Sequence, residues 1–160
     1  DNDGDMDVLY TNGDSFDNSC ASPTHGVQWL ESTDDTEFKY HRLVDLPGSY
    51  RALPADFDND GDLDVIAVAF LPPRVTPESL RTSTTASILI LEQTSHGSFT
   101  PRTFECGATN HATVETGDFD ADGDVDFVVG THLFPHGVMP GISTPSRLTV
   151  WWNEGMAATE

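Results

Sequence analysis

Asp56-Phe57-Asp58-Asn59-Asp60-Gly61-Asp62-Leu63-Asp64 carries aspartate at positions 1, 3, 5, 7 and 9 and glycine at position 6. The same pattern returns as Asp118-Phe119-Asp120-Ala121-Asp122-Gly123-Asp124-Val125-Asp126, and positions 3 to 9 open the chain as Asp1-Asn2-Asp3-Gly4-Asp5-Met6-Asp7. Fourteen of the 19 aspartates lie in these three stretches. The stretches recur about every 60 residues, which is the signature of a repeat architecture.

Short apolar or alternating runs surround each acidic stretch and indicate the class of the fold. Extended stretches precede the acidic motif at residues 49–55 and 112–116, and apolar runs follow it at 8–10, 65–70 and 127–130. Further runs come at 27–31, 88–92 and 148–152, and alternating ones at 38–43 and 99–104. No segment has a helical period, and Gly and Pro recur throughout. The sequence therefore predicts an all-β protein whose unit has four strands, A to D, with the acidic loop between A and B.

Four-stranded antiparallel units at this spacing are typical of β-propeller blades. We divide the chain into repeat 1 (partial, residues 1–47), repeat 2 (48–108) and repeat 3 (partial, 109–160), which supply strands B to D, A to D and A to C. A closed propeller needs roughly 4–8 blades. The chain is thus expected to be a fragment of one propeller domain, completed by further blades of a parent protein or by other chains.

The spacing of the aspartates favours calcium. Five carboxylates in nine residues repel one another unless a cation lies between them. Carboxylates at positions 1, 3 and 5 can converge, glycine at position 6 permits a sharp turn, position 7 offers a carbonyl and position 9 closes the site. The predicted Ca²⁺ ligands are Asp56, Asp58, Asp60, Asp62 and Asp64; Asp118, Asp120, Asp122, Asp124 and Asp126; and, in a loop that lacks its first two positions, Asp1, Asp3, Asp5 and Asp7.

Two other kinds of acidic loop compete with this interpretation. An EF-hand needs flanking helices and a glutamate at position 12, where the three repeats have Tyr10, Ala67 and Val129. A solvated acidic turn rich in Asp and Gly remains the alternative to a metal site.

The D-x-D-x-D-G-x-x-D loop between strands resembles FG-GAP and VCBS-type repeats, the propeller blades of integrin-like and many secreted bacterial proteins.

This resemblance implies a calcium-binding module of a secreted or cell-surface protein that acts as a non-catalytic binding or adhesion scaffold. The alternative it allows is the propeller portion of an extracellular polysaccharide lyase or hydrolase. Calcium sites of extracellular modules are weak, so they are filled outside cells and empty in a cytosol. Together with the three copies of the loop and the single lysine, this favours an extracellular location. With 27 acidic and 7 basic side chains, the net charge of −20 excludes nucleic acid as a partner. No apolar run is long enough to cross a bilayer, so membrane insertion is not expected.

The long connections predict where a ligand binds. Since successive strands are antiparallel, the acidic loops lie at one end of the sheets, and the B–C connections (11–25, 71–86 and 132–146) lie with the D–A turns at the other, the long-loop end. A carbohydrate or protein ligand is expected there, near Phe16, His25, Tyr50, Arg51, Arg74, Arg81, Asn110, His111, His132, Phe134 and His136.

Catalytic chemistry has little support in the sequence. No nucleophile, metalloprotease or phosphate-loop motif is present, and only His111 with Glu115 and His132 with His136 suggest acid–base or metal pairs. Cys20 and Cys106 fall at the long-loop end, where one disulfide and two free thiols are both compatible with their spacing.

Overall fold

Ten β-strands make up the computed structural model, which describes residues 1, 3–34, 37–82, 84–132 and 147–155. In these residues the only helix is a single 3-10 turn, η1 (Glu78–Leu80). In chain order the strands are β1 (Val8–Thr11), β2 (Gly26–Asp34), β3 (Glu37–Asp45), β4 (Ser49–Ala55), β5 (Asp64–Ala69), β6 (Ala86–Ser95), β7 (Ser98–Cys106), β8 (His111–Gly117), β9 (Asp126–Thr131) and β10 (Leu148–Trp151).

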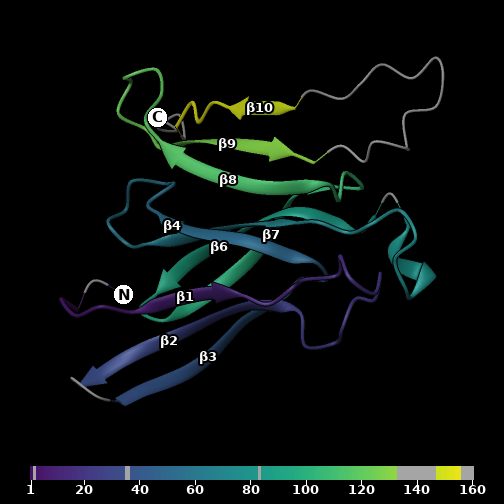
Figure 1. Ribbon diagram of the computed structural model, residues 1–160. Helices are drawn as coiled ribbons and strands as arrows, with labels where there is room; N and C mark the ends of the chain where they lie inside the picture. Colours follow the sequence, from purple (N-terminus) through teal and green to yellow (C-terminus); the bar gives the residue numbers. More distant parts are fainter. Residues whose placement is uncertain (2, 35–36, 83, 133–146, 156–160) are drawn as a thin grey trace.

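The strands form three antiparallel sheets, none of which closes on itself (Figure 1). The middle sheet has four strands in the order β4-β5-β6-β7, and the flanking sheets have the orders β1-β2-β3 and β10-β9-β8. The prediction of an all-β, antiparallel fold is confirmed. Each sheet lies within one of the three repeats, but the grouping of the repeats into one propeller domain stays a prediction.

Most strands are longer than the apolar runs that predicted them. Strand β6 was expected at 88–92 and extends over Ala86–Ser95. Two of the added pairs lie near its hairpin, where Gln93 is opposite Phe99 and Ser95 is opposite Ser98, and one lies at the other end, where Ala86 is opposite Cys106. Polar residues at such positions pair with the neighbouring strand through their backbones. They do not show the apolar alternation by which a strand is recognised in a sequence.

Strand β5, inside the middle sheet, is buried on both faces. Val65 and Ala67 belong to a core cluster shared with the first sheet, whereas Ile66 and Val68 belong to one shared with the third. All four side chains are at most 4% exposed. Because successive side chains of a strand point to opposite faces, a strand between two cores reads as a continuous apolar run.

The two ends of the stack differ, as the antiparallel order requires (Figure 1). The loops after β4 and β8 lie at the same end as the residues before β1, and we call this the acidic end. The long connections from β1 to β2 and from β5 to β6 lie at the opposite, long-loop end.

A small core of its own holds the long-loop end together. Ala21, Leu71 and Val75 are buried against one another. The first two long connections also pair through a backbone bridge between Cys20 and Thr76. These contacts tie the connection of repeat 1 to that of repeat 2, so the loops present an ordered surface.

Candidate functional site

The acidic loops of repeats 2 and 3 share one backbone conformation. Asn59 and Ala121, at position 4, have φ values of 59° and 65°. Gly61 and Gly123, at position 6, have φ values of 96° and 101°, and Gly4 in repeat 1 has 101°. Left-handed conformations at these positions curl the chain and turn the alternate aspartates inward. Glycine at position 6 is therefore required by the geometry.

Backbone N–H groups orient the carboxylates within each loop. Asp56 Oδ2 accepts a hydrogen bond from the Gly61 N–H at 3.0 Å, and Asp118 Oδ2 accepts one from the Gly123 N–H at 3.1 Å. The carboxylates at positions 3 and 5 each accept a hydrogen bond from the N–H two residues later. Each carboxylate named here keeps an oxygen or lone pairs that can contact a cation.

In repeat 2, Asp56, Asp58 and Asp60 converge as the sequence predicts. One carboxylate oxygen from each lies within 4.8 Å of the others. Asp56 Oδ1 is buried and has no hydrogen-bond partner in the described part of the chain. A buried carboxylate oxygen beside two further carboxylates needs a positive partner. The donor set, all hard oxygen, fits calcium.

In repeat 3 the converging set differs by one member. Oxygens of Asp118, Asp120 and Asp126 lie within 4.8 Å of one another. Positions 1 and 3 are thus common to both groups, while the third carboxylate comes from position 5 in repeat 2 and from position 9 in repeat 3. Asp122 and Asp64, also predicted as ligands, lie outside these groups.

The carboxylates at position 7 also lie outside both groups, in keeping with a ligand role for their backbone carbonyls only. Asp124 accepts a hydrogen bond at 2.6 Å from the side-chain amide of Asn59. A second contact joins the same loops, because the Asn153 amide donates to the Phe57 carbonyl at 2.8 Å. The loops of repeats 2 and 3 are therefore connected directly.

Position 9 has a structural role that the sequence analysis missed. Asp126 is 0% exposed and accepts the N–H groups of Phe119 at 2.9 Å and Asn153 at 2.8 Å. Asp64 accepts those of Phe57 at 3.1 Å and Gln93 at 2.8 Å. Each carboxylate joins the start of its loop to the chain at the end of strand C. Asp7 makes the corresponding bond to the Ser32 N–H.

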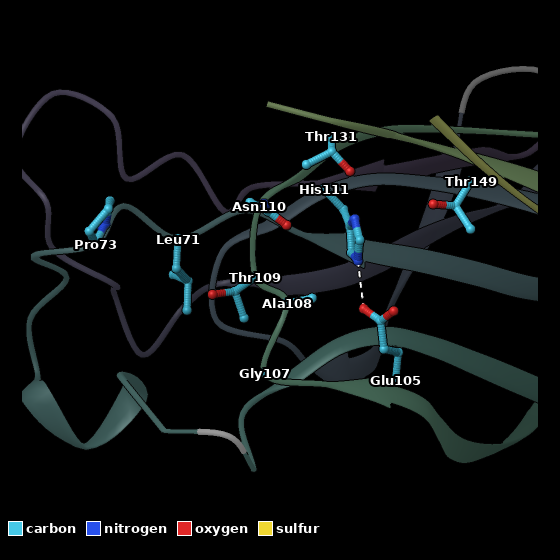
Figure 2. A pocket seen from close by; sticks show the side chains of 10 residues that line it. All are labelled: Leu71, Pro73, Glu105, Gly107, Ala108, Thr109, Asn110, His111, Thr131 and Thr149. Atoms are coloured by element: carbon cyan, nitrogen blue, oxygen red, sulfur yellow. Dashed lines mark hydrogen bonds and ion pairs between the residues drawn. The ribbon is translucent and has the colours of Figure 1, made fainter. Parts of the chain in front are cut away.

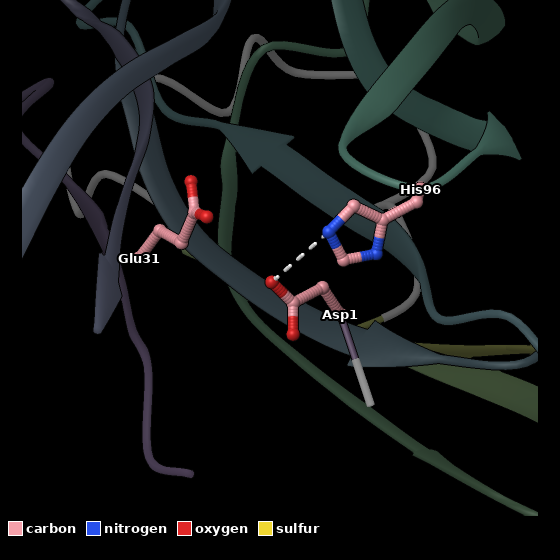
Figure 3. A group of neighbouring side chains, drawn as sticks. All are labelled: Asp1, Glu31 and His96. Carbon is pink, nitrogen blue, oxygen red and sulfur yellow. Dashed lines mark ion pairs between the residues drawn. The ribbon is translucent and has the colours of Figure 1, made fainter. Parts of the chain in front are cut away.

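In repeat 1, Asp1 meets two residues that no motif indicated (Figure 3). Oxygens of Asp1 and Glu31 and a ring nitrogen of His96 lie within 4.8 Å of one another. The Asp1 side chain is 2% exposed, and its Oδ2 lies 3.8 Å from His96 Nε2. Glu31 comes from β2 and His96 from the turn after β6, so only the tertiary fold unites them. Asp3 and Asp5 are not in this group.

Electrostatics in the loops disfavours ionisation without a cation. Burial raises the pKa of Asp58, and the carboxylates of Asp60 and Asp56 raise it further. The pKa of Asp120 is raised by burial and then by Asp122. Glu31 differs, because hydrogen bonds from Lys39 and His41 lower its pKa.

At the long-loop end, three predicted residues meet around a buried phenylalanine. Phe16 stacks on Phe70 with ring centroids 4.3 Å apart, and the Tyr50 and His132 rings contact Phe16 at 5.9 and 5.7 Å. Phe70 is 0% exposed, whereas Phe16 and Tyr50 are each 40% exposed. Phe70 belongs to an apolar run that the sequence predicts as a strand, and no pattern in the sequence indicates its part in this aromatic group.

Several other residues of the predicted ligand face hold the structure together. His25 is buried, which lowers its pKa, and its ring contacts the Gly48 N–H. Arg81 binds the Val75 carbonyl and pairs with Glu78.

The predicted pair of His111 with Glu115 is not formed, and the predicted pair of His132 with His136 includes a residue outside those that the structure describes. His111 hydrogen bonds to Glu105 at 2.6 Å, and Glu115 instead pairs with Arg51. His136 and Phe134 lie outside the described residues. Cys20 and Cys106 are both exposed free thiols, so the structure contains no disulfide between them.

Sheets stacked side by side, with an acidic loop between successive strands, define an all-β repeat protein. The model of the FG-GAP-like repeat family matches residues 1–67, a range that spans the first two acidic loops. This match supports an FG-GAP/VCBS-type repeat protein, in agreement with the resemblance drawn from the loops. No curated protein and no solved structure gives a significant match. The described residues include no helix long and apolar enough to cross a membrane.

Proposed function

We propose that the chain is a calcium-stabilised repeat module of a secreted or cell-surface protein, in which the sheets are β-propeller blades and the whole serves as a non-catalytic binding scaffold. The observation that carries this proposal is the convergence of Asp56, Asp58 and Asp60, with the buried Asp56 Oδ1 left without a partner. FG-GAP-like repeats commonly occur outside cells, where calcium is abundant.

Calcium would act on the fold rather than on a substrate. It would neutralise the loop and fix the connection between strands A and B, so binding energy would become folding energy. Extracellular modules bind calcium with a Kd of about 10⁻⁴–10⁻³ M. At millimolar calcium and the tighter end of that range, each site contributes about 1.4 kcal/mol.

The first prediction concerns the response to calcium. Adding millimolar calcium to metal-depleted protein is expected to raise the melting temperature, and the double variant Asp58→Asn/Asp120→Asn is expected to lose most of this rise. Each substitution removes a charge from a converging group while preserving size. Differential scanning calorimetry with calcium, with magnesium and with chelator measures the effect.

A matched control is Asp14→Asn/Asp17→Asn, which removes the same charge from a connection at the other end of the stack. This control should keep the full calcium response. Equal responses of the wild type and the loop variant would overturn the calcium proposal and leave the loops as solvated acidic turns.

A second prediction concerns pH. The carboxyls of Asp58 and Asp120 have pKa values raised from 3.8. In metal-free protein, such groups contribute stability that is fully present below the unfolded pKa and is lost as the pH rises through the folded pKa. Calcium binds the ionised forms, so stabilisation by calcium should shrink as the pH falls from about 7 to about 4. Melting temperatures with and without calcium test this, and a difference independent of pH would contradict it.

Binding at the long-loop end is supported by its exposed aromatic rings. Phe16 lies on the connection from β1 to β2 and Tyr50 lies at the start of β4; both rings are partly exposed and contact the buried Phe70 ring. Exposed aromatic groups on an ordered surface are typical of recognition sites.

A further inference from the structure

A pocket of about 380 Å³ lies at the long-loop end, between the second and third sheets (Figure 2). Its volume falls within the range of about 300–1,000 Å³ that is usual for small-molecule sites. Leu71 and Glu105 line it from the second repeat, and His111, Thr131 and Thr149 line it from the third. The pocket therefore exists only because two neighbouring repeats pack together.

The walls of the pocket combine apolar side chains with polar side chains that have no hydrogen-bond partner among the described residues. Leu71 and Pro73 form apolar wall, while Asn110, Thr131 and Thr149 contribute an amide and two hydroxyls. In the part of the chain that the structure describes, these three polar side chains make no hydrogen bond. Donors and acceptors that line a cavity without partners are available to a ligand.

Glu105 is held in place by two side chains and retains a free oxygen. Its Oε1 receives hydrogen bonds from His111 Nε2 at 2.6 Å and from the Ser87 hydroxyl at 2.7 Å. Ser87 is 0% exposed and the His111 side chain 8% exposed, so both supports are fixed by packing. Figure 2 shows His111 and Glu105 directed at each other. A carboxylate is an acceptor at both oxygens, which leaves Oε2 to accept from a ligand hydroxyl.

The charge of the pocket selects against anions. No lysine or arginine lines it, and Glu105 carries its one carboxylate. A phosphate, sulfate or uronate would meet like charge without a compensating cation. Apolar walls facing hydroxyl, amide and carboxylate groups suit a ligand with apolar C–H faces and a neutral edge of hydroxyls.

The exposed aromatic group is connected to the pocket through the backbone of Asn110. Asn110 pairs with Phe70 through a backbone bridge, and its carbonyl accepts the His132 N–H at 2.8 Å. Phe16 and Tyr50 pack on Phe70, so exposed aromatic rings lie one backbone contact away from a residue that lines the pocket.

We propose that this pocket, between the second and third repeats, binds a neutral saccharide. Glu105 accepts from sugar hydroxyls, Asn110 and the threonines complete the hydrogen bonds, and Leu71 with Pro73 contacts the C–H face. The proposal rests on the function of the chain as a binding module and names the class of its ligand.

The test uses the calcium-loaded chain and ligand-observed NMR with isothermal titration calorimetry. The probes are neutral di- and trisaccharides of glucose, galactose, mannose and xylose, with oligogalacturonate as the anionic comparison. At least one neutral probe should bind, and oligogalacturonate should not displace it. Glu105→Gln and Asn110→Ala should each raise the Kd of that probe by about tenfold or more, as expected when a strong hydrogen bond is lost.

The matched control is Glu115→Gln, which makes the same change on an exposed glutamate that pairs with Arg51 outside the pocket. It should leave the Kd unchanged. The inference is overturned if no neutral probe binds, if the pocket variants bind as the wild type does, or if oligogalacturonate competes. Calcium-dependent melting of the same samples separates the two proposals: a normal calcium response without sugar binding overturns this inference alone.

Discussion

Replacing Asp126 with alanine is expected to lower the free energy of unfolding by about 3 kcal/mol, even in the presence of chelator. Asp126 is fully buried and accepts two backbone N–H groups, one from the loop and one from the residues after β10. Hydrogen bonds to charged groups are worth about 1.5–3 kcal/mol each, and both N–H groups would lose their partner. Urea denaturation of metal-depleted protein measures the change.

The comparison variant is Asp122→Ala in the same loop. It removes the same charge, but Asp122 is exposed and accepts only a local N–H, that of Asp124. In chelator its effect should stay below about 1 kcal/mol. Equal destabilisation by both variants would contradict a structural role specific to position 9 and would point to loop charge as the common cause.

Phe70→Ala should destabilise the chain by about 3–5 kcal/mol, the range for removing a buried aromatic side chain. Phe70 is 0% exposed and stacks on Phe16, and it contacts the rings of Tyr50 and His132. Its backbone also pairs with Gly48 and Asn110. The substitution therefore removes contacts with residues from all three repeats. Thermal or urea unfolding measures the resulting change in stability.

Phe16→Ala serves as the control for Phe70→Ala. The Phe16 ring lies in the same aromatic group, but it is 40% exposed. Its removal should cost about 1 kcal/mol, because exposed side chains lose little burial on truncation. If Phe16→Ala proves as destabilising as Phe70→Ala, the aromatic group depends on its surface member, and the assignment of Phe70 as its support is wrong.

The strands could be predicted because each has an apolar centre that the sequence displays. β5 and β9 follow their acidic loops as unbroken apolar runs, and β4 was placed at its observed bounds, Ser49–Ala55. The ends of the strands could not be predicted, because the polar residues near the hairpins pair through their backbones and show no apolar pattern. The sequence also could not show that the sheets stack with β4 beside both β1 and β8.

The acidic loops could be predicted for a related reason, because their geometry is local. The carboxylates at positions 1 and 3 come together in both complete loops, and that at position 5 joins them in repeat 2, through turns that span a few residues. The positions of Glu31 and His96 beside Asp1 could not be predicted, because these residues come from a strand and a turn far along the chain. The pairing of His111 with Glu105, not Glu115, likewise depends on how β7 leads into β8.

The bonds from Asn59 to Asp124 and from Asn153 to Phe57 couple the acidic loop of repeat 2 to that of repeat 3. A stack of units that contact only their neighbours behaves as a one-dimensional chain, in which the state of one site shifts the odds of the adjacent one. Filling one loop would then order its neighbour before that neighbour binds. Calcium binding would then stabilise neighbouring units together. The module as a whole would become rigid over a narrow range of calcium concentration.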